Sequence, residues 1–295
     1  MGVKQVGALL FLSALWGGSF LFIRIAAPAL GPIVLIEVRV LLAGLALLGY
    51  AYVTGNLPAL RQYWRQYLAI GAINSAIPFV LISTAELHLP ASLAATLNAT
   101  TPLFGALVAA LWLGEALTVR KVVGLLAGFA GVAVLVGLGP LELNRTALWS
   151  VGASLLAAIF YGVGAVYTKV KMPGGEPQGL ALYSQLASAV VLLPVAPFAL
   201  PAAWPSTTVV ASVLTLALLC TALAYRIYFY LIVNVGPTRA TMVTYLSPAF
   251  GMLWGALFLH ESLGAGFLLG FPLILGSVAL VSGGGSKAKA VQVDG

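Results

Sequence analysis

Two copies of one pattern occur in this chain, PLFGALVAALWLGEAL at residues 102–117 and PAFGMLWGALFLHESL at residues 248–263. The copies align without gaps at an offset of 146 residues and share the same residue at nine of sixteen positions. Matching leucines and alanines carry little weight in an apolar chain, but proline, phenylalanine, glycine and glutamate matching in one register carry much more. We therefore interpret the chain as a duplication whose halves are residues 1–140 and 146–284.

The composition places most of the chain inside a lipid bilayer. Of its 295 residues, 61% are hydrophobic and 7% are charged, whereas about a quarter of the residues in a soluble protein are charged. A membrane-spanning helix needs roughly 20 mostly apolar residues, and continuous apolar runs favour helices over the alternating strands of a barrel. Ten such runs occur, at residues 5–27, 33–53, 67–87, 91–113, 122–138, 148–168, 180–200, 211–232, 240–259 and 264–282. The sequence predicts an all-α integral membrane protein with ten transmembrane helices.

The basic residues predict the orientation of these helices. Cytoplasmic loops of membrane proteins carry an excess of lysine and arginine. With the N-terminus inside, the cytoplasmic side holds Lys4, Arg61, Arg65, Arg120, Lys121, Lys169, Lys171, Arg239, Lys287 and Lys289. The outer connections then hold Arg145 alone. Both termini are expected in the cytoplasm, and the net charge of +7 requires no nucleic-acid partner.

An odd number of helices in each half has a geometric consequence. If the first five-helix repeat begins inside, the second begins outside, so the two repeats are inverted relative to each other. Many secondary transporters use inverted repeats for alternating access to a site near the bilayer midplane. The alternative is a duplication that persists in a static protein. Residues 285–295, which follow the second repeat, are expected to form a flexible cytoplasmic tail.

Two segments carry a resemblance to a known superfamily. They are VRVLLAGLALLG around Arg39 and LPASLAATLNATTPLFGALVAALWLGEALTVRKVVGLLAGFAGVAVLV at residues 89–136, which has a second copy in the other half. Together they resemble the drug/metabolite transporter superfamily, specifically the ten-helix EamA-type exporters. The resemblance implies export of a small metabolite across a bacterial inner membrane, and bacterial aromatic amino acid exporters are similar to this chain. Broad-specificity drug efflux is the alternative within transport.

Few charged residues lie within the apolar runs, and such residues are candidates for function because burying a charge in a membrane is costly. Arg24, Glu37 and Arg39 lie toward the outer ends of the first two runs. One interpretation is that they form an outer gate or contact a substrate carboxylate. The other is that Glu37 pairs with an arginine and the remaining side chains extend to the membrane–water interface. Arg226 lies in the eighth run among aromatic residues. It acts at an inner gate or on the substrate, or else it reaches the headgroups.

Polar residues beside prolines, together with aromatic residues, form the candidate substrate site. Proline removes a backbone hydrogen bond and frees a carbonyl within the helix. Hydrogen bonding between packed helices is the alternative role for the polar side chains, and packing is the alternative role for the aromatic rings. The candidates are Trp16, Asn74, Pro78, Asn98, Thr101, Tyr161, Tyr225, Tyr228, Thr244, Tyr245 and Ser247. We expect the first, third, fourth, sixth, eighth and ninth helices to line the cavity.

The sequence contains no recognisable enzyme motif. It has no phosphate-binding Gly-rich loop with the GxxxxGK[ST] pattern, and no cluster of residues with the spacing of metal ligands. Glu115 and Glu261 each precede a run, where a carboxylate stabilises the positive end of the following helix. The sequence therefore predicts no catalytic residue, no metal and no cofactor, and a monomer suffices for transport. A membrane enzyme or a sensor is the alternative class.

Overall fold

The computed structural model describes residues 1–138, 144–173 and 175–282 of the chain. The predicted boundaries at residues 140 and 284 and the predicted tail, residues 285–295, lie outside the described residues. The first half contains α1 Val3–Leu30, α2 Pro32–Val53, α3 Trp64–Gly71, the π-helix η1 Ala72–Ala76, α4 Ile77–Ala85, α5 Ala91–Asn98, α6 Thr101–Leu113 and α7 Val119–Gly137. The second half contains α8 Arg145–Lys171, α9 Pro177–Leu192, the 3-10 helix η2 Ala196–Ala199, α10 Thr207–Ala217, the π-helix η3 Leu218–Leu223, α11 Ala224–Val235, α12 Pro237–Ala240, α13 Val243–Leu259 and α14 Ala265–Ser282.

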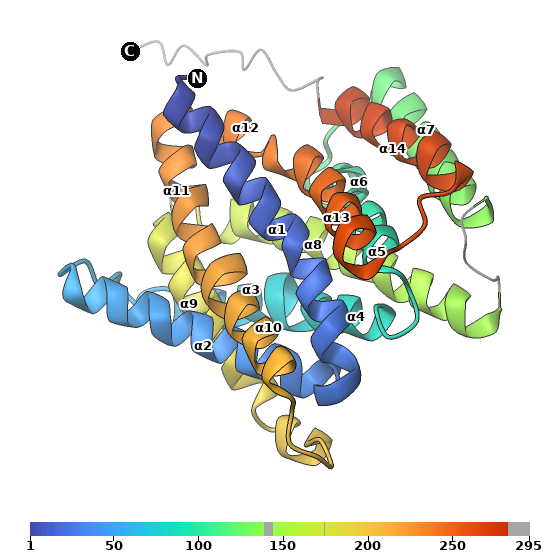
Figure 1. Ribbon diagram of the computed structural model, residues 1–295. Helices are drawn as coiled ribbons and strands as arrows, with labels where there is room; N and C mark the ends of the chain where they lie inside the picture. The colour runs from blue at the N-terminus through green and yellow to red at the C-terminus, as the bar shows by residue number, and fades with distance from the viewer. Residues whose placement is uncertain (139–143, 174, 283–295) are drawn as a thin grey trace, which may run out of the picture.

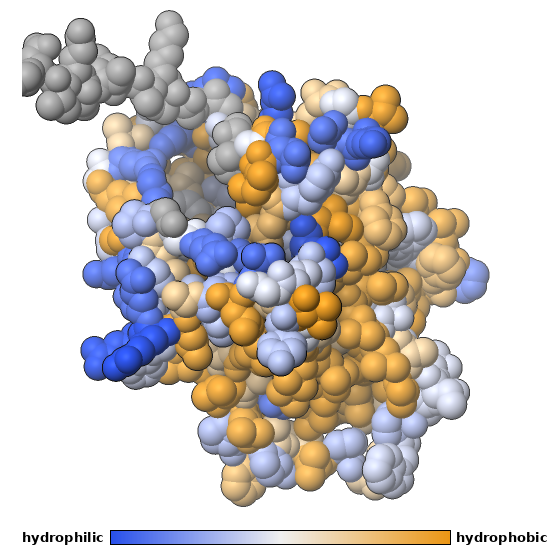
Figure 2. Space-filling view, turned by 90° about the vertical axis from the view of Figure 1, so that its left-hand side faces the viewer, coloured by the Kyte–Doolittle hydropathy of each residue, from blue (hydrophilic) through white to orange (hydrophobic). Residues whose placement is uncertain are grey.

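The described elements are all helical, and they confirm the predicted all-α membrane architecture. Eight continuous helical segments are long and apolar enough to cross a membrane. The remaining two are α13, with 17 residues, and α9, with 16. The seventh helix was expected over residues 180–200 but ends at Leu192, because Pro194 and Pro197 cannot continue a helix. Large apolar side chains cover much of the surface (Figure 2), as a lipid environment requires.

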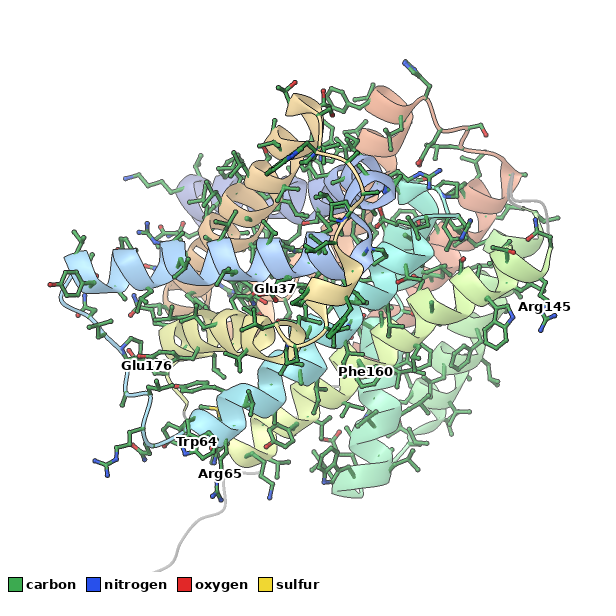
Figure 3. All side chains as sticks on the ribbon, turned by 90° about the horizontal axis from the view of Figure 1, so that it is seen from below. Glu37, Trp64, Arg65, Arg145, Phe160 and Glu176 are labelled. Atoms are coloured by element: carbon green, nitrogen blue, oxygen red, sulfur yellow. The ribbon has the colours of Figure 1, made fainter. Side chains whose placement is uncertain are left out.

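The two halves run in opposite directions through the molecule. The end of α5 that begins at Ala91 lies against Glu261, next to the last turns of α1. The far end of the α5–α6 segment leads to Glu115, which pairs with Lys169 in the last turn of α8. The equivalent helices α1 and α8 therefore finish at opposite ends, and Figure 3 places Arg145, where α8 begins, far from Arg65.

Helices of one half cross helices of the other half at glycines. A Cβ atom on Gly17 of α1 would lie 2.6 Å from the Ser247 carbonyl oxygen of α13. The equivalent crossing occurs at Gly162 of α8, where a Cβ atom would lie 2.8 Å from the Gly105 nitrogen of α6. Figure 1 shows α7 and α14 side by side, and this pair packs through Gly131 and Gly270. Small residues let membrane helices approach closely, so these positions hold the halves together.

Interruptions in the helices also repeat between the halves. The π-helices η1 and η3 begin at Ala72 and Leu218, which are 146 residues apart. Proline was expected to cause the interruptions in the fourth and ninth helices. Turns do separate α5 from α6 and α12 from α13, but Pro248 lies inside the continuous α13. The second turn thus precedes its proline by several residues.

Candidate functional site

Arg39 of α2 is the centre of a buried polar cluster. Its side chain is 4% exposed, and its Nε donates a hydrogen bond to Thr221 Oγ1 of η3 over 3.0 Å. The guanidinium carbon also lies 3.9 Å from the centre of the Phe79 ring of α4, in a cation–π contact. Burying a charge is costly unless the charge is paired. An anionic partner would therefore stabilise the buried Arg39 side chain.

No acidic side chain in the described part of the chain pairs with Arg39. The ion pairs among the described residues join Glu115 to Lys121 and to Lys169. A guanidinium has five N–H donors in a planar fork, which matches a carboxylate through two parallel hydrogen bonds. The bond to Thr221 uses the Nε donor only. A ligand carboxylate would complete the coordination of Arg39.

An amide oxygen without a partner lies in the same cluster. Gln185 of α9 is fully buried, and its Nε2 donates to Ser75 Oγ of η1 over 3.2 Å. Its Oε1 has no partner among the described residues. The Tyr225 hydroxyl lies near Ser75, Gln185 and Arg39. The cluster thus combines an unpaired cation with an available acceptor, which suits a zwitterion.

The π-helices bring their polar side chains into this cluster. Ser75 belongs to η1, and Thr221 belongs to η3. The Thr221 hydroxyl donates to the Leu216 carbonyl, five residues earlier, over 2.8 Å. It satisfies an acceptor of the widened turn while its oxygen accepts the bond from Arg39. A π-turn inside an α-helix is frequently found at a functional site, and here η3 contacts Arg39 through Thr221 while η1 contacts Gln185 through Ser75.

Aromatic rings form one wall beside the polar cluster. The centre of the Trp16 ring of α1 lies 6.2 Å from that of Tyr225 and 5.3 Å from that of Tyr228. Tyr225 stacks on Phe229 with their ring centres 6.1 Å apart. On the other side, Tyr161 of α8 packs edge-on against Phe79 at 6.4 Å. Aromatic faces of this kind bind flat apolar groups and cations.

A cavity of about 460 Å³ opens between α2, α9 and α11. Its lining includes Leu47, Ala181, Arg226 and Phe229. Along each helix the cavity leads toward the polar cluster: Gln185 lies one turn beyond Ala181, and Arg39 lies about two turns beyond Leu47. Arg226 is exposed and its guanidinium carbon lies 3.6 Å from the centre of the Tyr50 ring. Arg226 is thus at the cavity wall and is separate from the polar cluster.

The structure brings together part of the predicted site. Trp16, Tyr161, Tyr225, Tyr228 and Arg39 meet around the cluster. Two further candidates lie beside it in the third helical segment: Asn74 packs against Gly164 of α8, and the buried Pro78 begins α4. Through Arg39 and Gln185, α2 and α9 also contribute side chains to the polar cluster. These are the second and seventh predicted helices, which were not expected to line the cavity.

Other predicted residues lie outside the cluster. The hydroxyls of Thr101, Thr244 and Ser247 donate to carbonyls of their own helical segments. Tyr245 packs on a separate apolar cluster that contains Leu103 and Val278. Short polar side chains often satisfy a nearby carbonyl in this way. Asn98 is different, because its Oδ1 is buried without a partner among the described residues.

The predicted pairing of Glu37 with an arginine is not found among the described residues. Glu37 is buried and its Oε2 has no partner there; Figure 3 shows it on α2. Arg24 instead donates to the main-chain carbonyl of Glu86. The repeat between the halves did not predict the contact between Arg24 and Glu86, because this contact joins the first and third predicted helices.

The two glutamates that follow α6 and α13 make contacts between helices: Glu115 contacts the helix that follows it, as expected, whereas Glu261 contacts a different helix. Glu261 accepts hydrogen bonds from the Ala91 and Ser92 nitrogens over 2.7 and 2.9 Å, so it caps α5 of the other half instead of α14. Glu115 lies between two membrane-spanning segments and contacts Lys169 and Lys121. The hydrogen bond from Lys169, aided by Lys121, lowers the pKa of Glu115.

Gln185 and Glu86 are the buried polar residues that sequence reasoning missed. Both lie within predicted apolar runs, at residues 180–200 and 67–87. Both are fully buried and each has at least one oxygen without a partner among the described residues. The rule that intramembrane polar residues are functional candidates would have selected them. Glu86 lies next to a loop in the sequence, which concealed its burial.

Comparison with known proteins gives a consistent result. The model of the EamA-like transporter family matches residues 5–137 and again residues 148–283. The inner membrane transporter YedA of Escherichia coli K12 is 32% identical over 283 residues, which cover 94% of this chain and 90% of that protein. The transporter YvbV of Bacillus subtilis is 28% identical, covering 97% of this chain and 93% of that protein.

Two further similarities concern function in a relative and the fold. A protein of Streptantibioticus cattleyicolor named a probable terminal-alkyne amino-acid exporter is 29% identical over 283 residues, covering 95% of this chain and 93% of that protein. A solved crystal structure superposes with a TM-score of 0.67 at 18% identity and covers 95% of this chain and 96% of that chain. That likeness supports the fold of the whole described bundle.

Proposed function

The chain belongs to the EamA-like transporter family and is a multi-pass membrane transporter, not an enzyme; from this premise we propose that it exports small amphipathic metabolites, namely aromatic or neutral amino acids. The observation that carries the proposal is that Arg39 and Gln185 both lie, buried, around Tyr225. Arg39 lacks a carboxylate partner among the described residues, and Gln185 Oε1 lacks a donor there. An α-carboxylate and an α-ammonium would satisfy both groups.

The surroundings of the cluster favour a substrate with an apolar or aromatic side chain. Trp16, Tyr225 and Phe229 form an aromatic wall beside the polar cluster, and Phe229 also lines the cavity. The cavity volume of about 460 Å³ lies in the range of small-molecule sites. The relative from Streptantibioticus cattleyicolor is named a probable terminal-alkyne amino-acid exporter, and this name supports an amino acid as the substrate class.

Alternating access is the mechanism we propose. The cavity opens at the end that holds Glu176 and Pro58, which is the cytoplasmic end in the predicted topology. At the opposite end, Phe20, Leu35 and Leu216 belong to a continuous cluster of buried apolar side chains. The protein is therefore open to the cytoplasm and closed to the outside here. We place it in a bacterial inner membrane with both termini inside, acting as a monomer.

Transport by purified protein in vesicles tests the proposed substrate class. Wild-type protein should transport an aromatic amino acid well and the matching amine, which lacks the carboxylate, poorly. Arg39→Gln should lower transport of the amino acid by roughly 10- to 100-fold, since a hydrogen bond to a charged group contributes about 1.5–3 kcal/mol. Arg39→Lys keeps the charge but not the fork, so an intermediate loss is expected.

The controls separate the proposal from its alternatives. Arg226→Gln removes an arginine of the cavity wall and should leave the preference for acid over amine intact. Equal transport of acid and amine, or faster transport of lipophilic cations by Arg39→Gln, would support broad-specificity drug efflux instead. Absence of flux for every compound in a panel of amino acids, cations and sugars would favour a sensor.

A further inference from the structure

Glu86 is a second buried ionisable group, and it lies near Arg39 without forming an ion pair with it among the described residues. It follows α4, is fully buried, and its two carboxyl oxygens have no hydrogen-bond partner among the described residues. An isolated carboxylate in a low-dielectric interior is very unfavourable, so such a group takes up a proton. Burial therefore favours the neutral, protonated form of Glu86 in this conformation, although Arg24 and Arg39 lie near its carboxyl group.

Charged groups of three other elements face Glu86. Arg24 of α1 donates to the main-chain carbonyl of Glu86, and Arg39 of α2 and Glu261 lie near its carboxyl group. Glu261 is already engaged, because both its oxygens accept from the first nitrogens of α5. The adjacent α5, Ala91–Asn98, carries no titratable side chain, and Tyr161 of α8 lies near Arg39. Arg24 is the cation that a deprotonated Glu86 could reach by rotating its own side chain.

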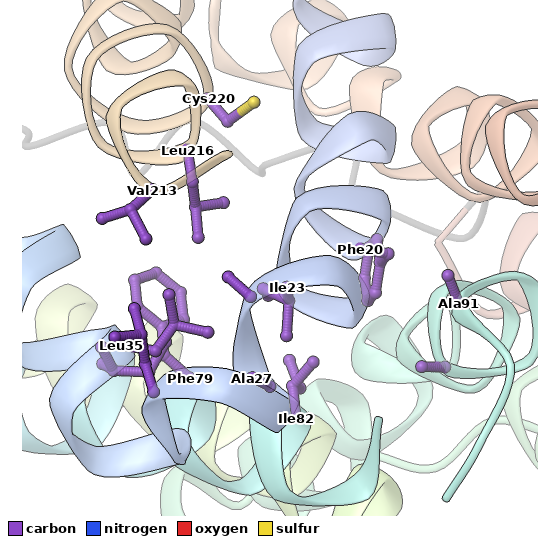
Figure 4. Close-up of a cluster of buried hydrophobic side chains, with 14 of the residues drawn as sticks. Phe20, Ile23, Ala27, Leu35, Phe79, Ile82, Ala91, Val213, Leu216 and Cys220 are labelled. Atoms are coloured by element: carbon purple, nitrogen blue, oxygen red, sulfur yellow. The ribbon is translucent and has the colours of Figure 1, made fainter. Parts of the chain in front are cut away.

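The apolar cluster that closes the outer end contacts Arg39 through Phe79, and along α4 it extends to Ile82, one turn before Glu86. Phe79 and Ile82 of α4 belong to it, together with Phe20 of α1 and Val213 of α10. Figure 4 shows Val213 above Phe79 on one side of α1, with Phe20 on the other side of that helix. Glu86 follows Ile82 by about one turn, so any movement of Glu86 and Arg24 acts on the contact between α1 and α4.

We propose that Glu86 is the proton-binding site of the outer gate, which closes only when Glu86 is protonated. The inference rests on the proposed function, since it assumes that this end opens during transport. When the end opens, water reaches Glu86 and the carboxyl group exchanges its proton with the outer solution. In the ionised form the carboxylate pairs with Arg24 in a hydrated, open arrangement. Uptake of one proton from the outer solution removes the charge, and the apolar cluster then closes over the neutral acid.

Cysteine accessibility tests the gate without any transported substrate. In a protein whose native cysteine is removed by Cys220→Ser, Phe20→Cys places a single thiol in the apolar cluster. With Glu86 present, labelling of this thiol should increase about tenfold from mildly acidic to mildly alkaline pH. A parallel Gln62→Cys protein, whose thiol is on the surface, corrects for the pH dependence of thiol reactivity. Glu86→Gln mimics the protonated acid, so labelling should stay low at every pH.

Two controls make the result specific. Glu115→Gln changes an exposed, ion-paired glutamate at the other end of the fourth segment and should leave the pH dependence as in the parent. The infrared carbonyl band of protonated carboxyl groups should be present at neutral pH in the parent and weaker in Glu86→Gln, where the buried Glu37 is still present. An unchanged band, or the same pH-dependent labelling in Glu86→Gln as in the parent, would overturn the proposal. Neither measurement depends on which metabolite is exported, so an error in the proposed substrate would not affect them.

Discussion

At the scale of single residues, the membrane makes each buried polar group informative. Arg39, Gln185 and Glu86 have buried side chains with partners that are incomplete among the described residues. In a soluble protein, water could form the missing hydrogen bonds at the surface. Here each group lies in an apolar run that keeps water away. The energetic cost of leaving them incomplete is our reason for assigning the first two to substrate and the third to a proton.

One residue carries backbone strain that can be relieved. His260 ends α13 in the left-handed region, with φ 54°, and its N–H donates to the Gly255 carbonyl. The equivalent position in the first half is Gly114, with φ 67° and the matching bond to Ala109. His260→Gly should stabilise the protein by about 0.5–1 kcal/mol, because glycine adopts this conformation without a steric cost.

Unfolding of the purified protein in detergent measures that change. His260 is exposed, so its replacement removes little packing. Gly114→Ala is the matched opposite and should destabilise the protein by about 1 kcal/mol. If the His260→Gly protein were less stable than the parent, the imidazole would stabilise the fold by more than the backbone strain destabilises it.

At the scale of the elements, the crossing of α1 and α13 depends on one glycine and not on its neighbour. A Cβ atom on Gly17 would meet backbone atoms of Ser247 and Gly251 at 2.6 and 2.7 Å. A Cβ atom on Gly18 would find its nearest neighbour, a Trp254 side-chain atom, at 3.7 Å. Backbone cannot move aside as a flexible side chain can, so only the first position excludes a methyl group.

Alanine at these two adjacent positions should therefore have opposite effects. Gly17→Ala should lower stability by about 1–3 kcal/mol, the range for overpacking a tight contact. Gly18→Ala should be neutral or raise stability by up to about 1 kcal/mol, because alanine favours the helix. Thermal unfolding in detergent compares the two variants directly. Similar losses from both would show that the helices can separate slightly to accept a methyl group.

At the scale of the whole molecule, the inverted halves and the distribution of basic residues together predict which end faces which compartment. Arg65 and Arg145 lie far apart, on opposite sides of the view in Figure 3. Hydrophilic side chains also gather toward one side of the face shown in Figure 2, beside a broad apolar surface. The predicted cytoplasmic termini follow from this distribution and from the positive-inside rule.

Labelling with a membrane-impermeant thiol reagent tests the orientation. In the Cys220→Ser background, Arg145→Cys should react in intact cells whose outer membrane has been made permeable. Gln62→Cys should react only after the inner membrane is lysed. Both positions are exposed, so a failure to react reflects the compartment and not burial. Reaction of both residues from the same side would contradict the inverted arrangement and the alternating-access mechanism that depends on it.

Patterns along the chain were enough to predict the membrane class, ten helices and the duplication. These properties depend on local hydrophobicity and on register, which are properties of contiguous residues. The same reasoning identified Arg39, Trp16, Tyr161, Tyr225 and Tyr228, because charged and aromatic residues stand out within apolar runs. The early end of α9 was also present in the sequence, as Pro194 and Pro197, but the apolar run across them concealed it.

Tertiary structure alone decides which polar groups meet and which remain without partners. In the sequence, Thr101, Ser247 and Gln185 are all polar residues within apolar runs. The two hydroxyls donate to carbonyls of their own segments, whereas the Gln185 Oε1 has no partner among the described residues. Glu261 and Glu86 differ in the same way: one caps α5, and the other lies buried beside Arg24. The physical reason is that pairing depends on contacts between helices far apart in the chain, whereas periodicity reports only the tendency of each helix to enter the membrane.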